Sequence, residues 1–466
     1  MGARITKFTL KNVRCFNSEQ TLRIRPITLL VGENSAGKST VLGSYSALVS
    51  AFGGRPFNLN KEPYKMGTFD DIISKSRKSN EGFALSMEYA GDEDTVTYKY
   101  VFIPGAGAKS YSKVIYEFRS GGSITFIVRP HTSSNKPFKI LLDEFCQVKK
   151  VKDNFVIQVK SEMKHFPSMM PLLVNGALFT PQKKKTKHVQ DFLVFCEKKM
   201  GFVRNIMLLM MLENIVSIAP ARSKPQRTYD STNEMITPEG PPNIASAIAE
   251  YDPAGGTIMP EGDDVPGTLA RLVRAKDGAW NSLQESFKKF GVSSGMFKDI
   301  SIKTFGNTMS DPFQIQIKTG RHKVNITDVG YGVSQLLPIL MRVVAQQDSE
   351  ECARLLLQQP EMHLHPKAQA ELASLLVEFA KDGEGLNYLI ETHSDYIVDR
   401  IATEIRLGCI SPDNVSLVYC ESKNGNVKIH NIKFDKQGNR IDVPKGYREF
   451  FMRETDRVLG LTGLEK

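Results

Sequence analysis

The chain has 466 residues, of which 41% are hydrophobic and 24% are charged, a composition typical of soluble globular proteins. This length exceeds what one hydrophobic core usually organises, so we expect two parts or a large insertion. The formal net charge of +10 permits contact with nucleic acid or an acidic partner, although a solvated basic surface accounts for most of it. The densest lysine clusters, in residues 149–152 and 183–187, are candidates for contact with a polyanion such as DNA.

The sequence also bears on redox state and location. Its six cysteines, at positions 15, 146, 196, 352, 409 and 420, form no C-x-x-C pair and have no metal-ligand spacing with histidine, so we expect free thiols. Residues 1–5 lead into an alternating strand pattern without the apolar stretch of a signal peptide. The most apolar segment, Ile206–Leu212, is too short to span a bilayer and is expected to be a buried helix. These features predict a cytoplasmic protein without membrane contact.

The first predicted element with chemistry is a strand, loop and helix near the N-terminus. The apolar, β-branched run 27–31 predicts a strand, and the residues from Thr40 onward predict a helix. Between them lies the G-x-x-x-x-G-K-[ST] pattern of a phosphate-binding loop. In such a loop, Lys38 reaches the β- and γ-phosphates of ATP, and Ser39 is a ligand of Mg²⁺. The residues expected to bind ATP here are Gly32, Asn34, Ser35, Ala36, Gly37, Lys38, Ser39 and Thr40.

The middle of the chain has a different pattern. Residues 85–160 contain β-rich runs that alternate with glycine-rich turns, which predicts hairpins, and residues 186–216 read as helical. The nucleotide motifs resume only near Ser334, which is far from Lys38 for a compact ATPase domain. We therefore expect a discontinuous head made of residues 1–85 and 215–466. Residues 86–214 are expected to form an inserted region that is first β-rich and then helical.

The second motif, in residues 328–338, has two glycines in a turn followed by Ser334, which opens an apolar helix. Such a turn offers backbone N–H groups, a hydroxyl and a helix N-terminus to an anion, and it can grip a γ-phosphate. An ordinary N-capped helix explains the pattern about as well. The motif gains weight from its position immediately before the next apolar strand, which starts near Leu355.

Two apolar strands then end in polar residues. The run Leu355–Leu357 is followed by Gln358-Gln359-Pro360-Glu361, and a later run, 386–390, ends in Glu391-Thr392-His393-Ser394. The first has the layout of an ATPase strand that ends in catalytic carboxylates, yet it carries glutamines there. The sequence therefore raises the question of whether the chain hydrolyses ATP or only binds it.

The order of these four motifs resembles that of the ABC-type ATPase heads of the RecF, SMC and OLD families. The resemblance covers residues 1–70 and 215–435, and it implies an α/β fold, an ABC-type P-loop ATPase head with a mixed β/α insertion. In such heads two subunits enclose ATP, and the signature serine of one contacts the γ-phosphate bound to the other. The resemblance thus implies a homo-oligomer with Ser334 acting in trans and His393 sensing the γ-phosphate. A histidine satisfied within the core at a strand end is the alternative for His393.

The chain departs from the family pattern where the strand should end in two acidic residues, because Gln358 and Gln359 stand there. Glutamine cannot accept a proton from water, and loss of a general base typically costs about 10²- to 10⁴-fold in rate. Glu361 and Glu391 are the carboxylates that could compensate. Glu361 is expected to point toward the loop before His363 and His365. Glu391 is favoured, because in these heads its strand lies between the phosphate-loop strand and the carboxylate strand. We expect Glu391 to be the base or a metal-shell ligand, with Gln358 reaching Mg²⁺ through water and Gln359 positioning the attacking water; Glu361 and His393 are the other catalytic candidates.

A closer resemblance narrows the family. Residues 219–229 and 438–447 are similar to stretches of small bacterial OLD-like ATPases found beside effector genes, such as the ATPase subunits of PARIS-type anti-phage systems. In the first stretch, Arg222 and Arg227 are either solvated loop charges or residues with a regulatory or nucleotide-facing role. His363 and His365 lack a third ligand at metal spacing, so we expect them to order a loop at the subunit contact.

Three functions fit these features. In the first, which we favour, the chain is a slow ATPase that acts as an oligomeric sensor and scaffold. It holds a separate toxic effector, expected to be a nuclease, until a phage trigger protein causes release. In the second, it is a RecF/SMC-like ATPase of DNA repair or chromosome maintenance that binds DNA. In the third, it is a nucleotide-gated structural module with negligible turnover. No nuclease is expected within this chain, because only a short segment follows residue 419 and it lacks an acidic metal-binding cluster.

Overall fold

The computed structural model describes residues 4–52, 57–60, 63–74, 82–91, 94–104, 111–128, 146–151, 154–159, 203, 205–206, 214–220, 222, 224–229, 265–275, 279–306, 308, 311–345, 353–380, 386–448, 456–457 and 459. The strands are β1 (Arg4–Lys11), β2 (Gln20–Arg23), β3 (Ile27–Gly32), β4 (Phe83–Ala90), β5 (Thr95–Ile103), β6 (Tyr111–Phe118), β7 (Ser123–Val128), β8 (Cys146–Val151), β9 (Asn154–Val159), β10 (Asn214–Ile218), β11 (Asp299–Thr304), β12 (Phe313–Lys318), β13 (Lys323–Asn325), β14 (Ala353–Gln358), β15 (Asn387–Glu391), β16 (Val415–Lys423), β17 (Asn426–Phe434) and β18 (Arg440–Ile441). The α-helices are α1 (Lys38–Phe52), α2 (Phe69–Ile72), α7 (Val265–Ala275), α8 (Ala279–Ser294), α9 (Tyr331–Ala345), α10 (Pro366–Phe379) and α11 (Asp395–Arg406).

The central sheet has the strand order β10-β14-β15-β3-β16-β17-β18 within the described part of the chain. Its first five strands are parallel, whereas β17 and β18 pair antiparallel at the far edge. β15 therefore lies between β3, which leads into the phosphate loop, and β14, which ends in the glutamines. Because the carboxyl ends of parallel strands meet at one edge of a sheet, the loops that carry the motifs converge there.

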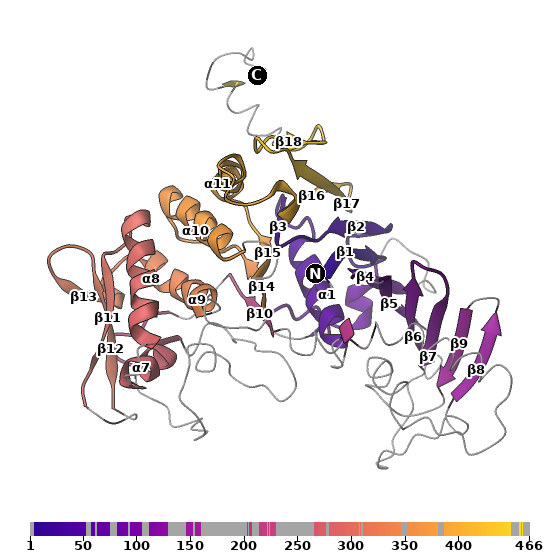
Figure 1. The fold of residues 1–466 in the computed structure, drawn as a ribbon, viewed down its shortest axis with the longest axis horizontal. Helices are drawn as coiled ribbons and strands as arrows, with labels where there is room; N and C mark the ends of the chain where they lie inside the picture. The colour runs from indigo at the N-terminus through magenta and orange to yellow at the C-terminus, as the bar shows by residue number, and fades with distance from the viewer. Residues whose placement is uncertain are drawn as a thin grey trace.

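Both faces of the central sheet are covered, each by a different layer. Leu29 and Val31 of β3 pack in the same core as α7 to α11, whereas Leu30 packs in the core that contains α1 and the second sheet. This alternation follows from the two-residue period of a strand. Burial on both faces explains why β3, β14 and β15 are continuous apolar runs. Figure 1 shows α10 and α11 on one side of β15 and β3, and α1 on the other.

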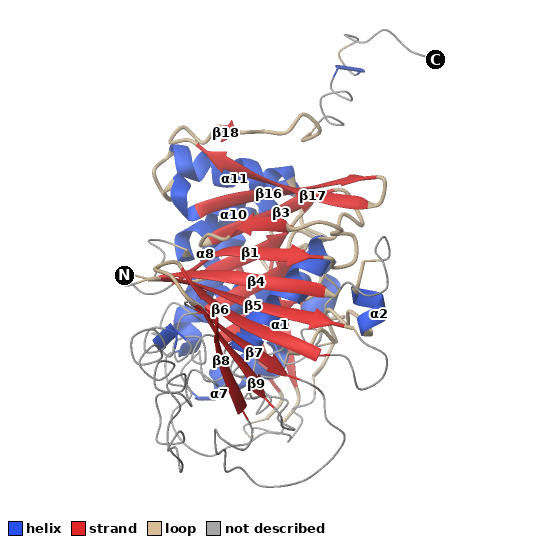
Figure 2. Ribbon diagram, turned by 90° about the vertical axis from the view of Figure 1, so that its right-hand side faces the viewer, coloured by secondary structure: helices blue, strands red, loops and turns tan. Residues whose placement is uncertain are grey.

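The second sheet has the order β2-β1-β4-β5-β6-β7-β9-β8 and is antiparallel except for the parallel pair of β7 and β9. Figure 2 shows its strands side by side across the molecule. Aromatic rings join this sheet to α1: Phe8 meets Tyr45 edge-on at 5.3 Å between ring centroids, and Phe52 stacks on Tyr89 at 4.6 Å. Since α1 begins at Lys38, this packing fixes the helix whose N-terminus follows the phosphate loop.

A three-stranded antiparallel sheet, β11-β12-β13, packs with α7 and α8 at the other end of the molecule. A short 3-10 turn, Ile326–Asp328, leads from β13 to α9. Ser334 thus lies in the first turn of α9.

The structure differs from the sequence-based expectations at two element boundaries. The hairpins expected over residues 85–160 are present, but β4 begins at Phe83 and pairs with β1, so the expected division between residues 85 and 86 falls inside a strand. The division of the chain into head and insertion stays a prediction. The helix expected over residues 186–216 is wrong at its end, because Asn214–Ile218 form β10 beside β14. The β-branched residues of that segment favour a strand. Most of residues 186–213, and the lysine cluster at 183–187, lie outside the described residues.

Candidate nucleotide-binding site

The backbone of the phosphate loop has the conformation that an anion cradle requires. Gly32, Ser35 and Gly37 have φ angles of +143°, +63° and +77°, and turns with such residues can form concave anion-binding sites from backbone N–H groups. A Cβ at Gly32 would lie 2.4 Å from the carbonyl oxygen of Cys420, and a Cβ at Gly37 would lie 2.6 Å from the Cys15 sulfur. Both positions therefore require glycine for space as well as for backbone conformation.

Lys38 is folded back over this loop. Its side chain is buried, and Nζ donates hydrogen bonds to the carbonyl oxygens of Gly32 at 3.0 Å and Glu33 at 2.7 Å. Burial lowers the pKa of Lys38, and the nearby carboxylate of Glu391 opposes this shift. The ammonium group is thus held at the cradle, where it can neutralise phosphate oxygens.

Ser39 and Glu391 are in direct contact. The Ser39 hydroxyl donates a hydrogen bond of 2.8 Å to Oε2 of Glu391, which is only 5% exposed at the end of β15. Burial raises the pKa of the Glu391 carboxyl, whereas the hydrogen bond from Ser39 and the charge of Lys38 oppose the rise. A carboxylate with a raised pKa beside the expected metal ligand is suited to accept a proton from water.

The two glutamines at the end of β14 adjoin this carboxylate in different ways. Gln358 is buried and is the register partner of Glu391 on the neighbouring strand, and its amide opposes the rise in the pKa of that carboxyl. Gln359 is half-buried, has a φ of +43°, and donates its backbone N–H to the Glu391 carbonyl at 2.7 Å. Hydroxyl, carboxylate and amide oxygens, here from Ser39, Glu391 and Gln358, are the donors that Mg²⁺ prefers, so this group of residues fits that ion.

Glu361 lies closer to the site than expected. The sequence suggested that it would point toward the loop before His363, but its Oε1 accepts the backbone N–H of His393 at 2.7 Å. Burial raises the pKa of the Glu361 carboxyl, and the hydrogen bond from His393 opposes this. Partial burial, together with the charge of Lys38, lowers the pKa of His393. Glu361 thus holds the backbone of the turn that carries the expected γ-phosphate sensor.

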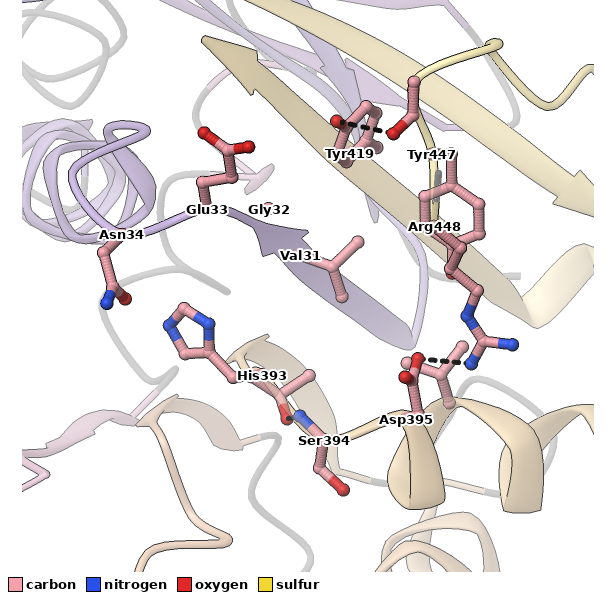
Figure 3. Close-up of a pocket in the computed structure, with 13 residues that line it drawn as sticks. Val31, Gly32, Glu33, Asn34, His393, Ser394, Asp395, Tyr419, Tyr447 and Arg448 are labelled. Atoms are coloured by element: carbon pink, nitrogen blue, oxygen red, sulfur yellow. Dashed lines mark hydrogen bonds and ion pairs between the residues drawn. The ribbon is translucent and has the colours of Figure 1, made fainter. Parts of the chain in front are cut away.

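A cavity of about 660 Å³ opens between the first residues of the phosphate loop, the turn after β15, α11 and the C-terminal segment. Figure 3 shows the imidazole of His393 turned toward the side of the cavity formed by Glu33 and Asn34. The opposite wall is Tyr447 and Arg448, neither of which sequence reasoning identified. The only sequence signal for that wall was the resemblance of residues 438–447 to other ATPases, which gave no role to any side chain.

Arg14 was also missed. It lies in the turn between β1 and β2 with a φ of +47°, and its guanidinium donates to Thr40 Oγ1 at 3.4 Å and to the Met66 carbonyl at 2.8 Å. In the rest of the phosphate loop, Ala36 is buried and Ser35 is exposed. A positive charge in the turn that precedes the phosphate-loop strand was the available signal for Arg14.

Ser334 does not line this cavity. Its hydroxyl donates to the Tyr331 carbonyl at 2.8 Å within the first turn of α9, and it borders a separate small hollow with Arg222 and Tyr229. A role for Ser334 on the nucleotide of a second copy therefore remains a prediction that this placement permits.

The paired histidines have structural contacts. The ring of His363 packs edge-on against Tyr331 at 5.1 Å, and His365 caps α10 by accepting the N–H of Lys367 at 3.3 Å. Among the described residues, no group of three or more His, Cys, Asp or Glu side chains is arranged to hold a metal ion. Over the same residues, none of the helices has the length and apolar character needed to cross a bilayer.

Comparison with known proteins identifies the family of the chain. A sequence model of the AAA ATPase domain matches residues 4–237 and 265–398, which is more than half of the chain. The chain belongs to this ATPase family. The match confirms the expected α/β P-loop ATPase fold and shows that the chain is an ATP-binding, ATP-hydrolysing enzyme. The effector, the trigger and DNA lie outside what the match shows.

Other comparisons add less to the ATPase assignment. An Smc head bound to the C-terminal winged-helix domain of ScpA is 12% identical, with a TM-score of 0.45 over 93% of this chain and 98% of that one. An Smc head with an extended coiled coil, bound to the C-terminal domain of ScpA from Pyrococcus furiosus, is 12% identical with a TM-score of 0.43, over 98% of this chain and 100% of that one. No curated protein matches the chain.

Proposed function

We propose that this ATPase turns over ATP slowly, with Glu391 in place of the acidic pair that is missing from β14. The observation that carries the proposal is the 2.8 Å hydrogen bond between Ser39 and Glu391, because it puts the carboxylate beside the hydroxyl expected to bind Mg²⁺. Glu391 accepts a proton from the attacking water, or holds the water shell of the metal. Gln358 and Gln359 position water through their amides. The bound Mg²⁺ supplies charge stabilisation for the transferred phosphoryl group.

The other residues of the site bind and orient ATP. Lys38 and the N–H groups of the loop hold the phosphates, and His393, in the turn after β15, faces the γ-phosphate. Slow turnover follows from having one carboxylate where the family has two. Slow turnover also suits a protein that must stay loaded with ATP until a signal arrives.

We place this activity in an oligomeric sensor and scaffold of anti-phage defence. Two copies would enclose ATP, with Ser334 of each copy on the nucleotide of the other. A separate toxic effector, expected to be a nuclease, would be held by the oligomer and released when a phage protein triggers it. The support for this role is the resemblance of residues 219–229 and 438–447 to OLD-like defence ATPases.

The scaffold is tested by expressing the chain with the protein encoded beside its gene and measuring the mass of the purified material with and without MgATP. We expect an oligomer that contains both proteins and depends on Lys38. A chain that stays monomeric and alone in both conditions would contradict this role.

The second candidate is a RecF/SMC-like ATPase that binds DNA. Lys149 and Lys150 belong to β8, the edge strand of the antiparallel sheet, and their charges are the sequence feature that favours a polyanion. Binding of duplex DNA that weakens steeply with salt and stimulates ATP hydrolysis would favour this function over the scaffold. Substitution of Lys149 and Lys150 by glutamine would then reduce both effects.

A further inference from the structure

Arg222 joins two parts of the ATPase that are far apart in sequence. It lies just beyond the end of β10, and its guanidinium Nη1 donates to the Gln335 carbonyl of α9 at 2.8 Å. The Arg222 backbone N–H donates to Oε1 of Gln335 at 3.2 Å. The Gln335 side-chain amide in turn donates a longer hydrogen bond, of 3.5 Å, to the Arg222 carbonyl. Arg222 is 6% exposed and Gln335 is 1% exposed. The residue after Ser334 is therefore fixed by Arg222 through both its backbone and its side chain.

This contact leaves most of the guanidinium without a partner. Nε and Nη2 of Arg222 are buried and have no hydrogen-bond partner among the described residues. Oε2 of Glu361 is likewise buried and without a partner in the part of the chain that is described. Buried unpaired polar atoms are costly, and a guanidinium beside a carboxylate is the pair that would satisfy both.

The charges of these two groups interact. Burial lowers the pKa of Arg222 to about 10, and the charge of Glu361 opposes this shift. Burial raises the pKa of Glu361. Each group is thus kept away from water with its charge incompletely compensated, which favours any movement that brings the guanidinium and the carboxylate together.

Glu361 continues the connection to the nucleotide site. Its other oxygen, Oε1, holds the backbone N–H of His393. The same loop also packs against the start of α9, because a Cβ at Gly332 would lie 2.4 Å from the His363 carbonyl oxygen. A shift of α9 therefore cannot occur without moving the loop that supports His393.

We infer that Arg222 is a positioning residue that couples the two nucleotides of an ATP sandwich. Ser334 would contact the partner's nucleotide, whereas His393 faces the chain's own nucleotide. The guanidinium of Arg222 connects the backbone beside Ser334 to Glu361, and Glu361 connects it to His393. In the closed, ATP-bound head the free nitrogens of Arg222 pair with Oε2 of Glu361. Binding at one site then sets the position of His393 at the other. This inference rests on the proposed sandwich.

The test is ATP hydrolysis by the full-length chain as a function of ATP concentration, in the wild type, Arg222→Gln, Glu361→Gln and the double variant. Glutamine at 222 can still donate to Gln335 but cannot pair with a carboxylate. We expect both single variants to lower kcat about tenfold, the scale on which misplaced groups lose rate, and to bring the Hill coefficient down to one. The dissociation constant for MgATP should change less than kcat. The double variant should be no slower than the single variants, because both remove one connection.

Arg400→Gln is the matched control. Arg400 is a partly buried arginine that pairs with Glu371 of α10 at 3.2 Å, away from the loops of the site. It should lower the melting temperature without changing the Hill coefficient. If the wild type is cooperative and Arg222→Gln leaves both the Hill coefficient and kcat unchanged, Arg222 does not couple the sites, although the sandwich itself still stands. A wild type that binds and hydrolyses ATP without cooperativity would contradict the sandwich as well, so the two failures are distinguishable.

Discussion

Gln358 and Glu391 are register partners on adjacent parallel strands, and the glutamine amide opposes the rise in the pKa of the Glu391 carboxyl. The acidic group that is absent from the end of β14 is therefore present at the same level of the sheet, one strand closer to the phosphate loop. Neighbouring strands lie about 4.8 Å apart, a distance that a side chain of this length can span. The site thus has a carboxylate near the expected metal position, but on β15 and not at the end of β14, where the family pattern places it.

Mutation can return the carboxylate from the end of β15 to the end of β14. In the Glu391→Gln background, Gln358→Glu returns a carboxylate to β14, and we expect it to recover at least about tenfold of the lost turnover, which is part of what a general base contributes. Steady-state ATP hydrolysis measures this. Gln437→Glu in the same background adds the same charge at an exposed turn and should recover nothing.

The pH dependence of stability should reveal the buried carboxylate. Burial raises the folded-state pKa of Glu391, so its ionised form destabilises the folded chain at neutral pH, and this cost disappears as pH falls through the folded pKa toward the unfolded value. Glu391→Gln should therefore melt at a higher temperature than the wild type at pH 7. The difference should shrink at lower pH, which thermal unfolding from pH 7 to pH 5 would show. A difference that grows toward low pH would contradict the raised pKa.

Mixing two inactive variants tests whether Ser334 acts in trans. Lys38→Ala removes the phosphate-loop lysine and Ser334→Ala removes the signature hydroxyl, so each protein alone should hydrolyse almost no ATP. In an equal mixture, half of the randomly assembled dimers contain one complete site, so up to about a quarter of the wild-type rate should return. Inactivity of the mixture, with mixed dimers detected by mass, would show that Ser334 does not act on the partner's nucleotide.

Gly32→Ala tests the close approach in the phosphate loop. The added Cβ would lie 2.4 Å from the Cys420 carbonyl oxygen at a φ of +143°. Strain of this kind costs about 1 to 3 kcal/mol, and we expect weaker MgATP binding as well, because the loop must deform. Chemical denaturation and nucleotide titration measure the two effects. Gly320→Ala, where nothing lies within 4 Å of the added Cβ, should change neither.

The sequence was sufficient to place the main parts of the site, because its motifs depend on topology. The loops after β3, β14 and β15 meet since parallel strands carry them to one edge, and this put Glu391 beside Ser39. Local backbone turns were less predictable. The positive φ angles of Gln359 and His363 fold the loop back and bring Glu361 under His393, a bend that residue order alone does not encode.

Contacts between distant segments were the least predictable. Arg222 was open to two interpretations, because nothing near it in sequence identifies Gln335, 113 positions away, as its partner. The helical pattern expected up to residue 216 overlaps the start of β10, because a short apolar segment has no decisive period without its neighbouring strand β14.

A single-turnover measurement of MgATP hydrolysis with Glu391→Gln and Lys38→Ala tests the central claim most directly. Glu378→Gln, which removes an exposed carboxylate paired with Lys289, serves as the control and should match the wild type. We expect Lys38→Ala to abolish ATP binding. Glu391→Gln should still bind MgATP but hydrolyse it about 10²- to 10⁴-fold more slowly, as loss of a general base predicts. Hydrolysis by Glu391→Gln at the wild-type rate, with Lys38→Ala inactive, would show that Glu391 is not the replacement for the missing acidic pair.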